Sequence, residues 1–284
     1  MEKYCILYNP HAGNGTGKTS AEKLNALLPE VSLNYKDITE IEDYASFFAS
    51  LEEGEKIIIS GGDGTLNRFV NDTAALELPC DVYYFASGSG NDFLRDIGET
   101  IGQKPVCITP YIKNLPTVTV KDKTDLFING IGYGIDGYCC EVGDHIRQTS
   151  DKPVNYTSIA IKGLLFHYKP TNAKVTVDGK TYEFKKVWIA PTMKGRFYGG
   201  GMMPTPKQNR LDPDKKLSLM VFHGSGKLKT LMIFPSLFKG EHVKHTKYVT
   251  ILEGSEMTVK FDQPTALQID GETILGVTEY TARI

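Results

Sequence analysis

The sequence predicts two structural classes in one chain: an α/β domain with a parallel sheet and helices on both faces, then an antiparallel β-sandwich. The first class is indicated by an apolar strand, Ile57–Ile59, that ends in a glycine-rich loop, with the same strand–loop–helix order on either side. The second is indicated by short segments from about Leu115 that alternate apolar and polar residues. We expect the α/β domain over 1–114 and the β-sandwich over 115–272, with a tail, 273–284, that could return to the first domain.

The composition is that of a folded protein with a substantial core. The 284 residues are 40% hydrophobic and 23% charged, with a formal net charge of −2, so we expect no nucleic acid as a partner. The N-terminal apolar run is too short for a signal peptide, and no run is long enough to span a membrane. The five cysteines are scattered without a CxxC pair. We therefore expect neither disulfides nor a cysteine metal site, and a cytoplasmic location.

The loop after the apolar strand has the composition of a phosphate-binding site. It consists of Ser60, two glycines, Asp63, a third glycine and Thr65, and a helical pattern follows. A strand that ends in glycines and opens a helix leaves backbone N–H groups at the positive end of the helix dipole, which favours phosphate. A tight turn is the simpler interpretation, but a turn does not need three glycines around an acid.

Two further strands end in loops of the same kind. Tyr4–Tyr8 leads into a loop rich in asparagine and glycine, whose ending Gly-Lys-Thr is similar to a Walker A motif. That match fails because the motif requires glycine where this chain has Ala12. Val82–Ala86 leads into a third loop, over residues 87–92. Because ligands bind beyond the carboxyl ends of parallel strands, we expect the three loops to meet at one edge of the sheet.

The second half is predicted to be mostly strands, with helices over 154–168 and 228–238. Lysines flank the apolar stretches of both helices, which is typical either of a helix on a membrane surface or of a core-facing helix with a solvated rim. A GxGxxG match at 132–137 has no βαβ unit after it, so we interpret it as a turn for backbone packing or between domains. The expected strands are Thr117–Lys121, Asp125–Asn129, Ala173–Val177, Tyr182–Ala190, Lys216–Phe222, Tyr248–Leu252, Glu256–Phe261 and Thr265–Ile269.

Five motifs, in order along the chain, resemble the diacylglycerol kinase catalytic family. They are NPxxG at 9–13, GGDGTLN at 61–67, a GxGND variant at 88–92, YGGGMMPTP at 198–206 and DGE at 270–272. This family belongs to the lipid-kinase branch that includes sphingosine and ceramide kinases, and its wider fold is shared with NAD kinases. The resemblance implies a nucleotide-binding α/β domain, a β-sandwich domain and an active site in the cleft between them.

The resemblance also implies ATP and a lipid alcohol as substrates. Ser89 stands where the family commonly has threonine and keeps the hydroxyl, and Thr39 matches a nucleotide-contact threonine of the family. The implied nucleotide-binding residues are Asn9, Pro10, Gly13, Thr39, Gly61, Gly62, Asp63, Gly64, Thr65, Asn67, Ser89, Gly90, Asn91 and Asp92.

Transfer of the γ-phosphoryl group to an alcohol also needs Mg²⁺ and a base. Asp63 and Asp92 would supply carboxylates for Mg²⁺, directly or through water, although Asp92 could instead cap the following helix. The DGE motif of the family makes Asp270 the proton acceptor, while Glu272 helps to hold Mg²⁺ or orients the base. From the residues alone, Asp270 could simply be part of a hairpin turn. A carboxylate with an ordinary pKa of about 4 is a weak base for an alcohol, so its proton is expected to move late in the transfer.

A second metal site is implied near Asp212. Many bacterial members of the family have a DDG-type segment there that binds a structural Mg²⁺, whereas this chain has Asp-Pro-Asp without the glycine. Asp212, Asp214 and the carbonyl of Leu217 could hold the metal. An ordinary Asp-Pro turn is the alternative.

The resemblance thus predicts an ATP- and Mg²⁺-dependent kinase of a lipid hydroxyl, with diacylglycerol converted to phosphatidic acid. We expect it in the cytoplasm, with visits to the inner membrane surface. Two other functions compete with this one: a kinase of a soluble substrate such as NAD, and a non-catalytic regulatory protein that binds a nucleotide. The segment 198–206 and the DGE motif favour the lipid branch, and the retained acids argue against lost activity. The sequence decides neither which lipid is used nor whether a homodimer forms.

Overall fold

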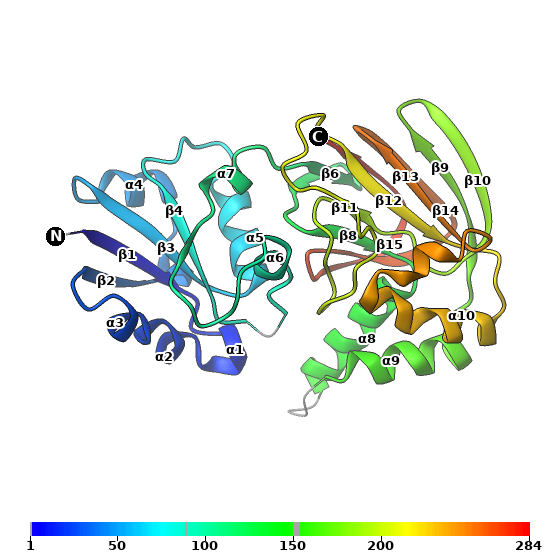
Figure 1. Cartoon of the computed structure of the whole chain (residues 1–284), viewed down its shortest axis with the longest axis horizontal. Coiled ribbons are helices and arrows are strands. Elements are labelled where there is room, and N and C mark those ends of the chain that lie inside the picture. The colour runs from blue at the N-terminus through cyan, green and yellow to red at the C-terminus, as the bar shows by residue number, and fades with distance from the viewer. Residues whose placement is uncertain (1, 89, 150–153) are drawn as a thin grey trace. The chain divides into compact units, whose positions relative to one another are not determined.

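The computed structural model describes residues 2–88, 90–149 and 154–284. The chain divides into two compact units, Met1–Leu115 and Pro116–Ile284. An α/β unit and an antiparallel β unit follow one another, which confirms the predicted fold class (Figure 1).

A sheet of five strands among the described residues forms the centre of the first unit. The strands are β1 (Lys3–Tyr8), β2 (Ser32–Asp37), β3 (Glu55–Gly61), β4 (Val82–Ala86) and β5 (Val106–Cys107), in the order β2-β1-β3-β4-β5. The first four are parallel to their neighbours, whereas β5 is antiparallel to β4. Ile57, Ile58 and Ile59 in β3 are fully buried, as expected for a strand covered on both faces.

Helices cover both faces of this sheet. On one face, α2 (Gly17–Glu22) and α3 (Leu24–Leu27) bury apolar residues against Ile6 and Ile58. On the other face lie α4 (Tyr44–Ala49) and α5 (Asp63–Asp72) (Figure 1). Their Tyr44 and Phe69 rings meet edge to face, with centroids 5.6 Å apart. The short elements are α1 (Ala12–Gly15), η1 (Ile38–Glu40), α6 (Asp92–Asp96) and α7 (Thr109–Ile112).

The described part of the second unit contains ten strands in one sheet that folds over on itself as a sandwich (Figure 1). They are β6 (Thr117–Val120), β7 (Lys123–Leu126), β8 (Gly130–Tyr133), β9 (Thr171–Val177), β10 (Lys180–Val187), β11 (Thr192–Met193), β12 (Leu217–Phe222), β13 (Val249–Gly254), β14 (Glu256–Ile269) and β15 (Glu272–Arg283). The first half of β14 pairs with β9 and the second half with β8, so this strand joins the two layers. Val175, Leu219 and Val259 belong to the core between them.

Two strand predictions need correction. The segments expected as separate strands at Glu256–Phe261 and Thr265–Ile269 are one strand, because β14 continues through a register shift between Lys260 and Leu267. The segment expected as strand Asp125–Asn129 ends its pairing at Leu126. Ile128 and Asn129 lie between the strands, and the backbone N–H groups of residues 128–130 bond to a side chain.

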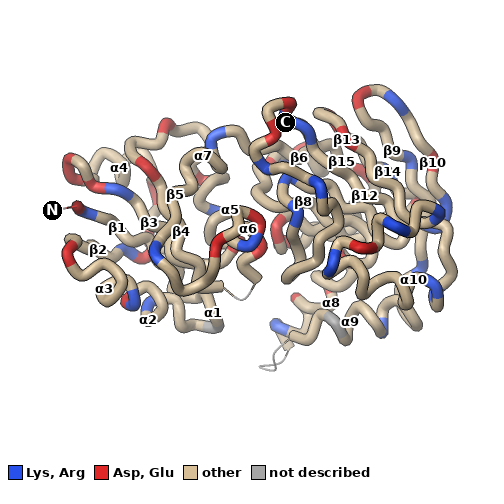
Figure 2. The backbone as a smooth tube through the Cα atoms, in the orientation of Figure 1, with Lys and Arg blue, Asp and Glu red and all other residues tan. Residues whose placement is uncertain are grey.

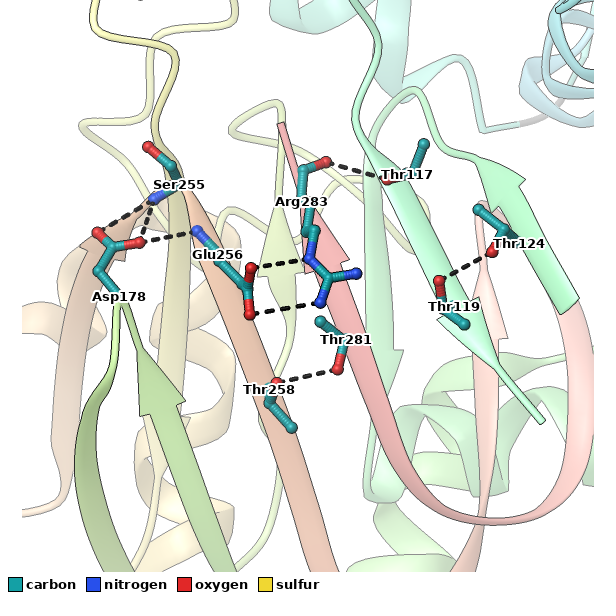
Figure 3. Close-up of polar contacts among 9 residues, drawn as sticks. All are labelled: Thr117, Thr119, Thr124, Asp178, Ser255, Glu256, Thr258, Thr281 and Arg283. Carbon is teal, nitrogen blue, oxygen red and sulfur yellow. Dashed lines mark hydrogen bonds and ion pairs between the residues drawn. The ribbon is translucent and has the colours of Figure 1, made fainter. Parts of the chain in front are cut away.

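Residues 273–284 belong to the second unit, so the expected return to the first domain is wrong. They form most of β15, which pairs with β14 and β6. Figure 3 shows the end of this strand: the Arg283 side chain bonds to Glu256 (Nε–Oε2 2.8 Å), and the hydroxyls of Thr258 and Thr281 are 2.9 Å apart. The physical reason is the alternating pattern of the tail, which buries Val277 and Tyr280 in the sandwich core.

The GxGxxG segment runs from the end of β8 into α8 (Ile135–Thr149), a helix that the sequence pattern does not predict. The expected backbone packing is confirmed, because a Cβ at Gly137 would lie 1.9 Å from the Ala266 carbonyl oxygen. The segment is not a turn between domains, since strand and helix both belong to the second unit. Glycines and cysteines at the start of the helix give a weak helical signal in the sequence.

The helices expected over 154–168 and 228–238 are present, each in two pieces. The first consists of α9 (Tyr156–Lys162) and the π-helical η2 (Gly163–His167), the second of α10 (Lys227–Ile233) and η3 (Phe234–Lys239), and η4 (Glu241–Lys244) follows. Pro235 in the first turn of η3 explains the second break, because proline lacks the N–H that a continuing helix requires. Among the described residues, no helix combines the length and the apolar character needed to cross a membrane.

Candidate functional site

The glycine-rich loops at the carboxyl edge of the first sheet contact one another. Asn9 follows β1, and its side-chain nitrogen donates a hydrogen bond of 2.9 Å to the hydroxyl of Thr65, in the first turn of α5 after the second loop. The Asn9 backbone N–H donates to the Ser60 carbonyl at 3.1 Å, and its side-chain oxygen accepts from the His11 N–H at 2.9 Å. Asn9 therefore joins the first loop to the second by its backbone and its side chain.

The third loop contacts both of the others through positions where only glycine fits. A Cβ at Gly88 would lie 2.5 Å from the Cα atom of Gly62. Gly13 has φ +59°, and a Cβ there would lie 3.1 Å from the Ser87 carbonyl oxygen. These approaches confirm that the three loops meet at one edge of the sheet, as the order of strands and loops predicts.

Asp63 connects the second loop to the helix that follows the third. Its carboxylate accepts the backbone N–H groups of Asp92 (2.7 Å) and Phe93 (3.3 Å), in the first turn of α6. The N-cap position of α6 is Asn91, at φ +50°. The alternative interpretation of Asp92 as the N-cap is therefore wrong, because Asp92 is the first helical residue and Asp63 satisfies its N–H.

Asp63 and Asp92 are carboxylates of the kind that bind Mg²⁺, and the Asp63 side chain contacts the backbone of Asp92. Asp92 is buried, and its side chain lies 3.8 Å from the Arg95 guanidinium. Gly90 lies beside Asp63, where a Cβ would come within 3.5 Å of a carboxylate oxygen. Two carboxylates from neighbouring loops, next to backbone that phosphate can approach, match the hard oxygen ligands that Mg²⁺ prefers. These residues fit the ion that the resemblance implies.

The other predicted nucleotide residues lie near this edge in different surroundings. Pro10 follows Asn9 in the first loop, Asn67 lies buried in α5, and a side chain at Gly64 would meet no described atom within 4 Å. Thr39 follows β2 in an exposed turn, and its hydroxyl donates to Asp37 at 2.7 Å. The prediction for Ser89 lies outside the described residues.

Asp270 lies in the second unit, in the two-residue turn between β14 and β15. Its φ of +47° and the φ of +101° at Gly271 are those of a tight Asp-Gly hairpin. The carboxylate accepts three backbone N–H groups, from Ile128 (2.5 Å), Asn129 (2.8 Å) and Gly130 (2.9 Å). These three N–H donors match the acceptor oxygens of an ionised carboxylate. The hairpin interpretation is thus confirmed, and the turn places an acid on the segment 128–130.

Two buried cations, which no sequence motif singles out, are attached to the same segment. The Arg210 guanidinium donates to the Ile128 carbonyl and, at 2.8 Å, to the Asn129 side-chain oxygen. The Lys194 backbone N–H donates to the Asn129 carbonyl at 2.9 Å. Arg210 and Lys194 are each 5% exposed. An asparagine that closes the apolar run Phe127–Ile128 is the available sequence signal for this cluster.

Lys194 is a buried amine among other cations. Burial first and the charge of Arg210 second lower its pKa, Asp212 acts in the opposite direction, and the resulting pKa is about 8. Within the described residues, no carboxylate lies within ion-pairing distance of its Nζ atom. Since a desolvated charge without a counter-ion is costly, the surroundings of Lys194 suit a bound anion.

Asp136, in the first turn of α8, is a second perturbed group in this unit. Burial raises the pKa of its carboxyl, the Tyr198 hydroxyl and the Gln268 amide reduce that rise, and the resulting pKa is about 6. No group in the described part of the chain makes a well-aligned hydrogen bond to either oxygen. A Cβ at Gly132 would lie 1.6 Å from this carboxylate. The Asp136 side chain can therefore occupy this position only because residue 132 is glycine.

The remaining predicted residues lie in more ordinary surroundings. Glu272 is exposed, and its side chain makes no hydrogen bond or ion pair with the described residues. The Asp212 carboxylate accepts the Asp214 N–H at 3.1 Å, and Asp214 lies 3.8 Å from Lys216. Leu217 is buried as the first residue of β12. The part of the chain that the structure describes has no cluster of three acidic, histidine or cysteine side chains that could hold a metal.

Comparison with known proteins assigns both units to one family. The model of the diacylglycerol kinase catalytic domain matches residues 3–118, and that of the YegS C-terminal NAD kinase β-sandwich-like domain matches residues 129–283, more than half of the chain. The chain therefore belongs to the diacylglycerol kinase family, with a C-terminal domain of the YegS type.

Individual relatives are similar over nearly the whole chain. The proposed lipid kinase YtlR of Bacillus subtilis (strain 168) is 23% identical over 307 residues, covering 99% of this chain and 96% of that protein. A diacylglycerol kinase of the same organism is 22% identical over 293 residues, with 96% and 90% covered. The crystal structure of a proposed diacylglycerol kinase from Bacillus anthracis str. Sterne has a TM-score of 0.65 at 20% identity, with 99% and 91% covered. This likeness supports the fold.

Proposed function

We propose that this protein transfers the γ-phosphoryl group of ATP to the hydroxyl of a lipid, diacylglycerol being the first candidate. The observation that supports it most is the meeting of three glycine-rich loops, through Asn9–Thr65, Gly62–Gly88 and Asp63–Asp92, at the carboxyl edge of a parallel sheet. Such an edge presents backbone N–H groups to phosphates. Family membership supports the kinase class, and the relatives named diacylglycerol kinase suggest the lipid.

In this proposal the loops of the first unit hold ATP and Asp270 of the second unit receives the proton. The lipid oxygen bonds to the γ-phosphorus, the bond from that phosphorus to the bridging oxygen breaks, and ADP leaves with the electron pair. The hydroxyl proton passes to the Asp270 carboxylate. Backbone N–H groups from residues 128–130 fix this carboxylate in place. Because such bonds stabilise the ionised form and make it a weaker base, the proton is expected to move late in the transfer.

Asp63 and Asp92 would hold Mg²⁺, which when bound neutralises phosphate charge. Glu272 would help to hold the ion or orient the base. A structural metal held by Asp212, Asp214 and the carbonyl of Leu217 is also proposed. The alternative is an Asx turn, in which the Asp212 carboxylate accepts the Asp214 N–H and orders this segment without a metal.

Lys194 and Arg210 are proposed to stabilise charge on the transferred phosphoryl group. Both are buried and bonded to the segment that positions Asp270, Arg210 through its guanidinium and Lys194 through its backbone N–H, and their positive charge would act on a phosphoryl group transferred near this base. Positive charge placed where the transition state is negative is the main protein contribution to phosphoryl transfer.

One experiment separates lipid kinase, soluble-substrate kinase and regulatory protein. The protein is incubated with γ-labelled ATP, Mg²⁺ and either mixed lipids containing diacylglycerol or NAD, and the phases are separated. Label in the organic phase supports the proposal, and label on NAD supports the soluble-substrate alternative. ATP binding without label in either phase would leave a regulatory nucleotide-binding protein.

A further inference from the structure

Large apolar side chains lie exposed on the helical part of the second unit. Phe166 in η2 is 72% exposed, and Leu228 and Met232 in α10 are 73% and 74% exposed. Ile161 and Phe238, in α9 and η3, are 41% and 44% exposed. We call these five side chains the apolar face. Side chains of this size are seldom so accessible without a partner surface.

The apolar face is not an unfinished core, because the same elements bury other residues. Leu164, Ile233 and Leu237 are at most 2% exposed and belong to one buried cluster under the helices. Lys227 Nζ donates to the Leu165 carbonyl at 2.8 Å and ties α10 to η2. These helices are therefore fixed by their inner residues while the apolar face points outward. The sequence left open whether these helices face the core or a membrane surface. The inner residues do face the core, whereas the side chains of the apolar face do not.

Positive charge surrounds the apolar face. Residues 154–170 and 224–247 contain seven lysines and one acid, a net charge of +6 in a chain whose net charge is −2. The lysines are all exposed, and the acid, Glu241, lies 3.4 Å from Lys244. Figure 2 shows blue Lys and Arg positions on the helical part of this unit, at α9 and α10. The lysines are Lys162, Lys169, Lys227, Lys229, Lys239, Lys244 and Lys247.

We propose that the apolar face docks on an anionic lipid bilayer, with its side chains below the headgroups and the lysines at headgroup level. The choice of a lipid surface rests on the proposed function, since a kinase of a membrane lipid must reach its substrate there. Apolar insertion combined with electrostatic attraction is how amphipathic helices bind the membrane interface.

A second copy of the chain fits this face less well. Pairing two copies through it would bring two sets of seven lysines together with one acid each, and like charges at a contact oppose association. An anionic bilayer supplies the missing negative charge and accepts all five apolar side chains.

The test is sedimentation of the full chain with vesicles of phosphatidylcholine alone or of equal parts phosphatidylcholine and phosphatidylglycerol. Wild type should sediment with the anionic vesicles. The double variant Leu228→Ser/Met232→Ser should bind them at least about tenfold more weakly, since two apolar side chains no longer insert. Lys229→Glu should weaken binding by about tenfold or more and reduce its salt dependence.

Matched controls come from exposed positions elsewhere. Leu275 and Ile101 are 55% and 56% exposed, so Leu275→Ser/Ile101→Ser removes similar apolar area away from the face. Lys104→Glu reverses an exposed charge in the first unit. Both controls should bind vesicles as wild type does. Vesicle binding by Leu228→Ser/Met232→Ser equal to wild type would overturn the proposal. So would a lipid-free dimer that this double variant dissociates.

The membrane-docking proposal and the lipid-kinase proposal can be contradicted separately, because different measurements test them. Phosphorylation of a short-chain diacylglycerol dispersed without vesicles should be unchanged in Leu228→Ser/Met232→Ser if only docking is lost. Loss of vesicle binding in this variant supports the docking surface even if no lipid is phosphorylated by any form. Lipid phosphorylation by a wild type that does not bind anionic vesicles overturns the docking surface and leaves the kinase proposal standing.

Discussion

Asp270 and Asp178 occupy equivalent places in two Asp-Gly hairpins, with φ values of +47° and +46°. Each carboxylate also accepts backbone N–H groups of a neighbouring segment, from residues 128–130 for Asp270 and from Ser255 and Glu256 for Asp178 (Figure 3). The turn geometry alone therefore does not mark a proton acceptor. What distinguishes Asp270 is the buried cluster around it, whereas Asp178 is exposed.

Gly64→Ala separates fold stability from nucleotide binding. A Cβ at this position in the first turn of α5 meets no described atom, so alanine should raise the free energy of unfolding by about 0.5–1 kcal/mol. If phosphates lie at the start of this helix, the added methyl occupies their place, and ATP affinity should fall about tenfold or more. Thermal unfolding and titration calorimetry with ATP measure the two effects. Gly226→Ala, also in open space, is the control, and unchanged ATP affinity in Gly64→Ala would exclude this cradle.

The bond between Asn9 and Thr65 should appear as an energetic coupling. Asn9→Ala and Thr65→Val each remove the same 2.9 Å hydrogen bond, and each should lower the free energy of unfolding by about 1 kcal/mol. The double variant should lose clearly less than the sum, because the shared bond is lost only once. Denaturant unfolding of the four proteins measures the cycle. Additive losses would show that the bond does not join the loops.

The fold of the first domain could be predicted closely because the sequence signals for each of its elements lie within a short stretch of the chain. Each strand–loop–helix unit has its own apolar run and glycine loop, and the three successive isoleucines Ile57–Ile59 fit a strand that is buried on both faces. The second domain was less predictable because its pairings are distant in sequence. The sequence around Asp270 does not indicate that its carboxylate bonds to Asn129. It also does not indicate that Arg210 and Lys194 bond to the same residue. The pairing of the tail is not predictable for the same reason, since its partners in β6 lie about 160 residues earlier.

The pKa of Lys194 predicts a pH dependence for the reaction. With its pKa lowered to about 8, this amine is charged below that pH and loses its charge as the pH rises through 8. The rate at saturating ATP should therefore fall above about pH 8 if the charge stabilises the transferred phosphoryl group. Lys194→Arg, which stays charged, should remove this decline, and Lys194→Met should be slow at every pH. An unchanged alkaline limb in Lys194→Arg would assign it to another group.

Asp136 should make the second unit less stable as the pH rises from about 4 to 6. Its carboxyl is protonated up to a pKa of about 6 in the folded state, against an ordinary pKa of 3.8. In that window the folded state binds more protons than the unfolded state, so the free energy of unfolding falls with rising pH, by about 3 kcal/mol in all. Asp136→Asn lacks this dependence. The unfolding free energy of this variant should therefore increase relative to that of wild type as the pH rises from 4 to 6. If the unfolding free energies of the two proteins changed with pH in the same way, the raised pKa would be contradicted.

Whether Asp270 accepts the proton is tested most sharply by comparing Asp270→Asn with Asp178→Asn. Asparagine tolerates positive φ, so both hairpins should be preserved while each loses one carboxylate. The measurement is turnover of γ-labelled ATP with the lipid acceptor, alongside ATP affinity. We expect Asp270→Asn to abolish label transfer and to bind ATP normally, while Asp178→Asn keeps the wild-type rate. Transfer by Asp270→Asn at a rate close to wild type would rule out Asp270 as the proton acceptor.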